Sequence, residues 1–302
     1  MSDKKPAVCV VGLGSMGMGA AKSLLRAGFP TYGIDLNEAA CNELKAAGAV
    51  AAGPDGTAFA SELGALILLV VNAAQCEAVL FGENGLAGKL QRGTPIMVSA
   101  TISASDAKRI EAQLQPLGLP MLDAPVSGGA AKAASGEMTV MAAGAPETFV
   151  ALRPVLDAVA GKVYEIGSEI GLGATVKIIH QLLAGVHIAA GAEAMAMAAK
   201  AGIPLDLMYD VVTNAAGNSW MFENRMKSVV EGDYTPTSMV DIFVKDLGLV
   251  AETGRALKMP LPLASTALGM FTNASNAGFG RENDSAVIKS FSGIELPKGK
   301  TS

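Results

Sequence analysis

The sequence predicts an α/β protein in two parts. An N-terminal Rossmann domain with a mostly parallel, doubly wound sheet precedes an all-α C-terminal domain, and a long interdomain helix joins them. Three observations predict this. Short apolar runs alternate with helix-length segments up to about residue 166, and a glycine-rich turn follows the first of these runs. After about residue 166 the sequence shows only helical patterns. A length of 302 residues suits two domains. We expect an NAD-binding domain over 1–168 and a substrate and oligomerisation domain over 169–302.

The expected strands are short apolar runs bounded by turns, as buried parallel strands are. They cover 7–11, 31–34, 66–71, 96–100, 121–122, 138–143 and 163–166. Helices are expected from the first turn to about residue 27, over 103–114 with Ser103 or Ser105 as N-cap, and over 146–159 with Pro146 in the first turn. The C-terminal helices, separated mostly by prolines, are expected over 170–201, 204–215, 219–230, 238–257, 262–276 and 282–290.

Composition and charge exclude several classes of protein. A net charge of −5 argues against a nucleic-acid surface. The first residues hold no apolar segment of a signal peptide. Segment 182–199 is nearly long enough to span a bilayer, but it carries His187 and Glu193, so we expect a buried core helix. The three cysteines show no pairing or zinc spacing and are expected to pack in the core: Cys9, Cys41 and Cys76. We therefore expect a cytoplasmic protein that binds neither nucleic acid nor membranes.

The glycine-rich turn has the pattern of a dinucleotide site. It reads Gly12-Leu13-Gly14-Ser15-Met16-Gly17, follows a strand and opens a helix. Glycines there permit a tight turn and a close approach to a pyrophosphate, which the helix N-terminus favours. Asp35 ends the next strand, where a carboxylate bonds the ribose hydroxyls and repels a 2′-phosphate. These residues predict that the chain binds NAD. The alternative is that the glycines form an ordinary turn and that Asp35 is a solvated residue at the end of a strand.

Two further residues follow predicted strands and are candidates for cofactor contact. Asn72 and Thr101 come directly after the strands expected to end at residues 71 and 100. The carboxyl ends of parallel strands border the ligand crevice of an open sheet. Ordinary turn chemistry explains both residues equally well.

A second glycine-containing segment is a candidate anion site. Ser127, Gly128 and Gly129 follow the strand over 121–122 and offer a hydroxyl and unobstructed backbone N–H groups. Successive amides of this kind bind carboxylates. A plain glycine turn is the equally weighted alternative.

Lys177, His180 and Gln181 lie in the first turns of the long apolar helix. Positions i, i+3 and i+4 share one helix face, and a buried cation is costly unless it is paired or functional. A lysine that extends to solvent and a histidine satisfied in the core are the alternatives. His187 lies on the same face, but no acidic residue stands at ligand spacing, so we expect no metal.

With these pieces assembled, the chain resembles the β-hydroxyacid dehydrogenase family, which includes 3-hydroxyisobutyrate dehydrogenases and tartronate semialdehyde reductases. The resemblance covers essentially the whole chain and rests on four ordered motifs: Gly12–Gly17, Asp123-Ala-Pro-Val-Ser-Gly-Gly129, Gly171-Leu-Gly-Ala-Thr-Val-Lys177 and Phe243-Val-Lys-Asp-Leu247. It implies that Ser127, Gly128 and Gly129 hold the substrate carboxylate, and that Lys177 is catalytic. It also implies that Lys245 and Thr101 contact the cofactor.

One departure from the family narrows the substrate. The family usually carries two asparagines where His180 and Gln181 stand, and segment 177–187 most resembles the L-threonate dehydrogenase group, which uses NAD on a four-carbon sugar acid. The extra hydroxyls of such a substrate need extra polar partners. The resemblance thus favours a small carboxylate with several hydroxyls.

The expected reaction is the oxidation of a hydroxyl by hydride transfer, with neutral Lys177 taking the proton. Alternative substrates within the family are 3-hydroxyisobutyrate, D-glycerate and tartronate semialdehyde. The alternative from a different functional class is a protein that binds the cofactor but has lost catalytic activity. The Ala- and Gly-rich helices suit close packing between subunits, so a homodimer or homotetramer is expected.

Overall fold

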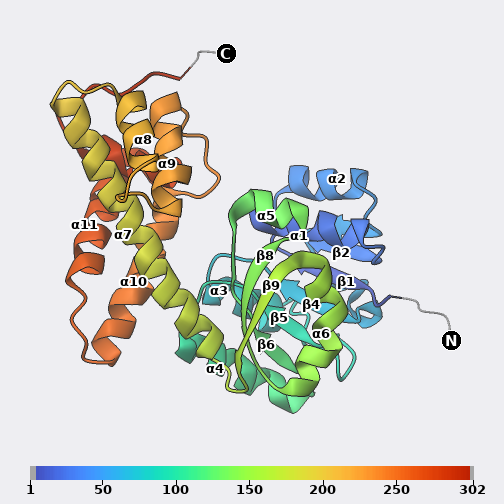
Figure 1. The fold of residues 1–302 in the computed structure, drawn as a ribbon. Helices are drawn as coiled ribbons and strands as arrows, with labels where there is room; N and C mark the ends of the chain where they lie inside the picture. The colour runs from blue at the N-terminus through green and yellow to red at the C-terminus, as the bar shows by residue number, and fades with distance from the viewer. Residues whose placement is uncertain (1–4, 300–302) are drawn as a thin grey trace. The chain divides into compact units, whose positions relative to one another are not determined.

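A computed structural model describes residues 5–299 and confirms the predicted order of an α/β part followed by helices (Figure 1). Residues 1–4, which belong to the segment expected to lack a signal peptide, and residues 300–302 lie outside the described range. The chain divides into two units, Met1–Lys177 and Ile178–Ser302, and the division falls inside one helix.

The first unit is built on one sheet whose strands are β1 (Val8–Val11), β2 (Thr31–Ile34), β3 (Ala51–Gly53), β4 (Ala65–Leu68), β5 (Ile96–Val98), β6 (Met121–Asp123), β7 (Val126–Ser127), β8 (Met138–Ala143) and β9 (Ala160–Gly167). The order is β3-β2-β1-β4-β5-β6-β8-β7, with β9 also paired to β8. The pairs from β3 to β6 are parallel, β8 runs antiparallel to β6 and β7, and β9 runs parallel to β8. Strand order reverses between β1 and β4, where open α/β sheets bind ligands.

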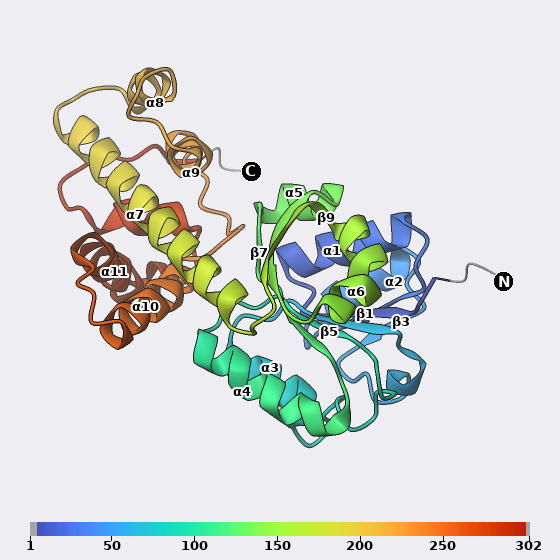
Figure 2. The ribbon, with the colours of Figure 1, turned by 60° about the horizontal axis from the view of Figure 1, so that its bottom comes forward.

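Helices cover both faces of this sheet, as Figure 2 shows. They are α1 (Ser15–Arg26), α2 (Glu38–Ala46), α3 (Ala73–Phe81), α4 (Ala104–Leu114), α5 (Gly129–Ser135) and α6 (Pro146–Val159), with short 3₁₀ turns at Ala60–Glu62 and Gln115–Leu117. In β1, Cys9 and Val11 belong to the core that packs on α3 and α4, whereas Val8 and Val10 belong to the core under α1, α2, α5 and α6. A strand buried on both faces has to be apolar throughout, which explains its uninterrupted apolar run.

Several local predictions are confirmed and others need correction. Ser103 caps α4 by accepting the Asp106 N–H at 3.0 Å, and Pro146 stands in the first turn of α6. All three cysteines are free and buried. The strands predicted over 66–71 and 96–100 end earlier, at Leu68 and Val98, because the chain there leaves the sheet for the next helix. Strands β3 and β7 were not predicted.

The second unit is helical. It contains most of α7 (Leu172–Lys200) and then α8 (Leu205–Thr213), α9 (Trp220–Glu231), α10 (Val240–Ala256), α11 (Pro262–Ala274), a π-type turn (Ser275–Phe279) and a 3₁₀ segment (Asp284–Ser290). The α-helix predicted over 282–290 is therefore a 3₁₀ helix.

One apolar core joins these helices, with Ile188 and Met195 of α7 buried together with Phe222, Leu247 and Phe271. Small residues on α7 allow close packing, since a Cβ at Gly185 would lie 2.9 Å from the Leu247 side chain. Helix α7 alone among the described helices is long and apolar enough to cross a membrane, and half of its most apolar window is buried within the structure. That burial suits the core helix expected from the sequence.

Candidate functional site

The three glycines of the Gly12–Gly17 turn differ in what surrounds them. Gly12 has a φ of +88°, and a Cβ there would lie 2.6 Å from the Leu69 carbonyl oxygen. A Cβ on Gly17 would lie 1.7 Å from the Gly12 carbonyl oxygen. A Cβ on Gly14 would meet nothing within 4 Å. Gly12 and Gly17 thus shape the turn, whereas Gly14 leaves open space above its backbone, where a ligand can approach.

The residues around this turn fit a dinucleotide. Ser15 and Met16 begin α1. The N-cap residue, Gly14, makes no side-chain hydrogen bond to the helix, so the N-cap places no side chain at the positive end of the helix dipole. The Asp35 carboxylate accepts hydrogen bonds from the backbone N–H groups of Leu13 at 2.6 Å and Asn37 at 2.8 Å. These bonds fix a carboxylate beside the turn, as ribose recognition requires.

Asn72 and Thr101 lie in loops at the carboxyl ends of β4 and β5. Asn72 is the N-cap of α3, and its Oδ1 accepts the Gln75 N–H at 2.9 Å. Thr101 is half-buried between β5 and α4. Asn72 therefore caps α3 in the structure. Contact of Asn72 or Thr101 with the cofactor stays a prediction.

The Ser127–Gly129 segment turns sharply between β7 and α5. Ser127 pairs with Thr139 of β8, and Gly128 and Gly129 follow with φ values of +127° and +70°. Side chains rarely tolerate two such conformations in succession. A Cβ on Gly128 would lie 2.8 Å from the Lys132 side chain, whereas a Cβ on Gly129 would meet nothing within 4 Å, so the open space that a carboxylate site needs lies at Gly129.

Asp123, at the end of β6, anchors the start of α7. Its Oδ2 atom accepts the backbone N–H groups of Gly171 and Ala174, each at 2.9 Å, and the residue is 1% exposed. A Cβ on Gly173 would lie 2.4 Å from the Asp123 carbonyl oxygen, so the helix end packs directly on the strand. Lys177, which is 6% exposed, follows one turn later. The strand that leads into Ser127–Gly129 thus also fixes the helical turn that carries Lys177.

Burial raises the pKa of Asp123 to about 6, although the N–H groups of Ala174, Gly171 and Gly173 favour the charged form. In the unfolded chain this pKa is about 3.9. Between these values the folded protein holds a proton that the unfolded chain has lost, so this carboxyl makes the protein less stable as pH rises through the interval.

The variant Asp123→Asn lacks this titration. We expect the free energy of unfolding of the parent protein, relative to the variant, to fall by about 2–3 kcal/mol between about pH 4 and pH 7. Urea denaturation of both proteins over this range measures the difference. A difference that stayed constant or grew with pH would show that Asp123 does not titrate in this interval.

A second polar cluster lies in the Ile178–Ser302 unit, on facing turns of α7 and α10. Asp246 is 2% exposed, and its Oδ1 atom lies 2.7 Å from the Lys245 Nζ. Its Oδ2 atom accepts the Gln181 Nε2 at 2.5 Å. The Gln181 Oε1 lies 3.0 Å from the Nδ1 of exposed His180. The structure thus brings together three predicted site residues, His180, Gln181 and Lys245, around a carboxylate.

Asp123 and Asp246 are the residues that sequence reasoning missed. Asp246 had a detectable signal, because it shares a helix face with Phe243 and Val250, which are both buried. A carboxylate on the buried apolar face of a helix is costly unless it is paired, as is a lysine in the same environment.

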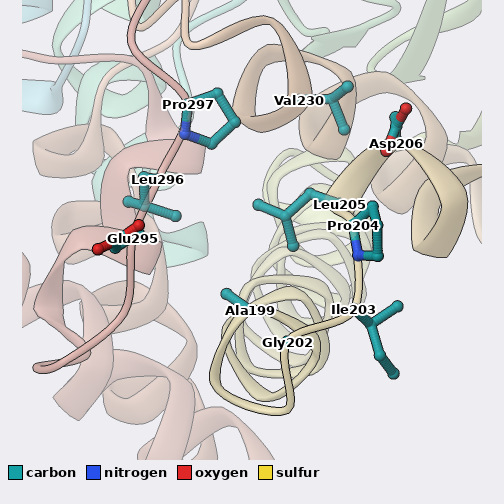
Figure 3. Close-up of a pocket in the computed structure, with 10 residues that line it drawn as sticks. All are labelled: Ala199, Gly202, Ile203, Pro204, Leu205, Asp206, Val230, Glu295, Leu296 and Pro297. Atoms are coloured by element: carbon teal, nitrogen blue, oxygen red, sulfur yellow. The ribbon is translucent and has the colours of Figure 1, made fainter.

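The described residues also include a pocket of about 700 Å³ in the second unit, shown in Figure 3. It is lined mainly by the end of α7, the start of α8 and the segment Glu295–Pro297. Ala199, on its wall, lies 18 residues beyond Gln181, which is about 27 Å along a helix. The pocket is therefore separate from the polar cluster.

Comparison with known proteins covers both parts of the chain. Residues 7–167 match the NAD-binding domain of 6-phosphogluconate dehydrogenase, and residues 171–291 match the NAD-binding family of NADP-dependent 3-hydroxyisobutyrate dehydrogenase. L-threonate dehydrogenase from Haemophilus influenzae is 70% identical over 99% of both chains. The enzyme of that name from Cupriavidus necator is 55% identical over 95% of this chain and 97% of its own. A crystal structure described as 3-hydroxyisobutyrate dehydrogenase from Salmonella typhimurium is 66% identical, with a TM-score of 0.92 over 95% of this chain and 100% of that one.

Proposed function

Since this chain belongs to the β-hydroxyacid dehydrogenase family, which includes the 3-hydroxyisobutyrate dehydrogenases, we propose that it oxidises L-threonate with NAD⁺ to a 2-oxo acid, 2-dehydro-L-erythronate. The chain is an NAD-dependent dehydrogenase of a small hydroxy acid; the identity of that acid is the proposal. The observation that carries it is the match to L-threonate dehydrogenases over nearly the whole chain.

The cofactor-binding residues proposed are Gly12, Leu13, Gly14, Ser15, Met16, Gly17, Asp35, Asn72, Thr101 and Lys245. The open space above Gly14 and the uncapped α1 N-terminus suit a pyrophosphate, and the fixed Asp35 carboxylate suits a free ribose 2′-hydroxyl. When bound, NAD⁺ supplies the hydride acceptor. The carboxylate at position 35 supports a preference for NAD over NADP.

Lys177 is the proposed catalytic residue. It is 6% exposed and follows the start of α7 that Asp123 anchors, so the helical turn that carries the amine is held on the sheet. In the oxidation direction the neutral Nζ takes the proton of the substrate hydroxyl, while the hydrogen on the same carbon leaves with its electron pair and a C=O bond forms. In the reverse direction the ammonium returns the proton to the oxygen.

Substrate binding is divided between an anion site and a hydroxyl site in this proposal. Ser127, Gly128 and Gly129 hold the carboxylate through a hydroxyl and backbone N–H groups. His180 and Gln181 stand where the family usually has asparagines, and they supply polar partners for additional hydroxyls. An unpaired buried polar group costs about 1–3 kcal/mol, so such partners favour a polyhydroxylated acid over a methylated one.

The test is NAD⁺ reduction with L-threonate, D-threonate, D-erythronate, D-glycerate and 3-hydroxyisobutyrate, with NADP⁺ tested in parallel. We expect the highest kcat/KM with L-threonate and NAD⁺. The description of the Salmonella typhimurium structure favours 3-hydroxyisobutyrate as the second candidate. A clear preference for 3-hydroxyisobutyrate or D-glycerate would rule out the threonate assignment, and equal use of NADP⁺ would contradict the role of Asp35. Absence of turnover with every acid would favour a cofactor-binding module.

We also propose that residues 1–168 form the NAD-binding domain, that residues 169–302 form the substrate and oligomerisation domain, and that the protein is cytoplasmic. Exposed apolar side chains on the second unit support self-association into a homodimer or homotetramer: Ile179, Leu183, Met197, Leu207, Val211 and Trp220. The sedimentation mass should therefore exceed that of one chain.

A further inference from the structure

The geometry points to Asp246 as a positioning residue, and we propose that it fixes the tautomer of His180 through the amide of Gln181. His180 then presents Nε2 as a hydrogen-bond acceptor to a substrate hydroxyl. This inference rests on the proposed function for the identity of the ligand. The tautomer is argued from the contacts of Gln181 with Asp246 and His180.

The first step is the orientation of the Gln181 amide. An ionised carboxylate only accepts hydrogen bonds, so the amide nitrogen, not the amide oxygen, has to face Asp246 Oδ2 at 2.5 Å. The reversed amide would bring two acceptors together inside a buried cluster. The Lys245 Nζ lies 2.7 Å from the other carboxylate oxygen, so a nitrogen that can donate lies close to each oxygen of Asp246.

The second step follows from the first. With its nitrogen directed at Asp246, Gln181 directs Oε1 at the His180 ring, 3.0 Å from Nδ1. An amide oxygen only accepts, so Nδ1 has to carry the proton. In the neutral imidazole the lone pair then lies on Nε2. A carboxylate on α10 thereby decides which nitrogen of a histidine on α7 accepts hydrogen bonds.

The third step concerns the ligand. A neutral His180 with an accepting Nε2 pairs with a group that donates, such as an alcohol O–H. It gains nothing from a methyl group and has no donor at Nε2 for a ketone. The residue therefore selects acids with a hydroxyl beyond the one that is oxidised. A group bonded in this way typically changes affinity by about 10-fold.

Imidazole ¹⁵N NMR tests the tautomer directly, without substrate. The chain has 2 histidines, so a protein freed of any purification tag gives two ring systems, and His187→Gln assigns that of His180. Long-range ¹H–¹⁵N correlations at about pH 8–9, where an ordinary histidine is neutral, distinguish the tautomers. We expect His180 to be protonated at Nδ1. A ring protonated at Nε2 alone would overturn the inference.

Two variants test the relay. Asp246→Asn keeps the shape but can donate as well as accept, and Gln181→Leu removes the amide while leaving the Asp246–Lys245 pair intact. Either should shift His180 toward the tautomer protonated at Nε2. Glu252→Gln, which removes an exposed carboxylate from the same helix, should leave the spectrum unchanged. An unchanged tautomer in both relay variants would refute the role of Asp246.

Kinetics then separate this inference from the proposed function. In Asp246→Asn, the ratio of kcat/KM for L-threonate over 3-hydroxyisobutyrate should fall about 10-fold, mainly through KM for L-threonate. A ratio that did not change would contradict the specificity role even with the expected tautomer. If the parent enzyme turned over neither acid, the proposed function would fail while the NMR result stood.

Discussion

Replacement of Lys177 by methionine should lower kcat by about 10²–10⁴-fold, the usual contribution of one general acid–base group. Methionine retains the length and the apolar stem of the side chain and removes the group that accepts the proton. Because the cofactor site is built from other residues, NAD affinity measured by fluorescence titration should change little. Thermal unfolding should confirm that the variant is folded.

Two further variants separate proton transfer from positive charge and from general effects on α7. Lys177→Arg keeps the charge, but a guanidinium does not lose its proton in proteins, so its kcat should fall as far as that of the methionine variant. Lys200→Met alters an exposed lysine at the other end of the same helix and should leave kcat unchanged. Near-normal turnover in Lys177→Met would remove Lys177 from the mechanism.

Features encoded by neighbouring residues could be predicted from the sequence. The strand β1, the Gly12–Gly17 turn and α1 follow one another within twenty residues, and each has a local physical cause. Doubly buried strands are apolar throughout, tight turns need glycine, and the following helix begins at the turn. For the same reason the Ser103 cap and Pro146 were placed correctly.

Features that depend on tertiary contacts could not be predicted in this way. β3 (Ala51–Gly53) consists of small, half-buried residues and exists because it pairs with β2. β7 has two residues and is defined by its pairing with β8. The 3₁₀ form of Asp284–Ser290 belongs to a segment whose side chains are largely buried among other helices, which overrides local helix preference.

The candidate site shows the same division. Lys177 was recognisable because a lysine in an apolar helix is costly. Its surroundings were not, since Asp123 lies 48 residues before Gly171 and Gln181 lies 65 residues before Asp246. The chemical types at these positions were visible, but which groups meet is a property of the fold. Hence the sequence could nominate His180 and Gln181, but not the direction in which the Gln181 amide points.

The second large effect is expected at Gly17. A Cβ there would lie 1.7 Å from the Gly12 carbonyl oxygen, so Gly17→Ala must displace the turn from the start of α1. The turn and the helix N-terminus bind the pyrophosphate together, and a hydrogen bond to a charged group contributes about 1.5–3 kcal/mol. Loss of two such bonds should weaken NAD binding by about 10²–10⁴-fold, measured by calorimetric titration, and the melting temperature should fall.

Gly14→Ala distinguishes the shape of the turn from access to it. Its Cβ meets nothing within 4 Å, so the melting temperature should stay near that of the parent protein. The methyl group nevertheless occupies the space through which a phosphate approaches the backbone, so NAD binding should still weaken. Gly88→Ala, equally uncrowded but outside the turn, should change neither property. Unaltered NAD binding in Gly14→Ala would mean that the pyrophosphate does not contact this turn, and the cofactor site would then have to lie elsewhere on the sheet.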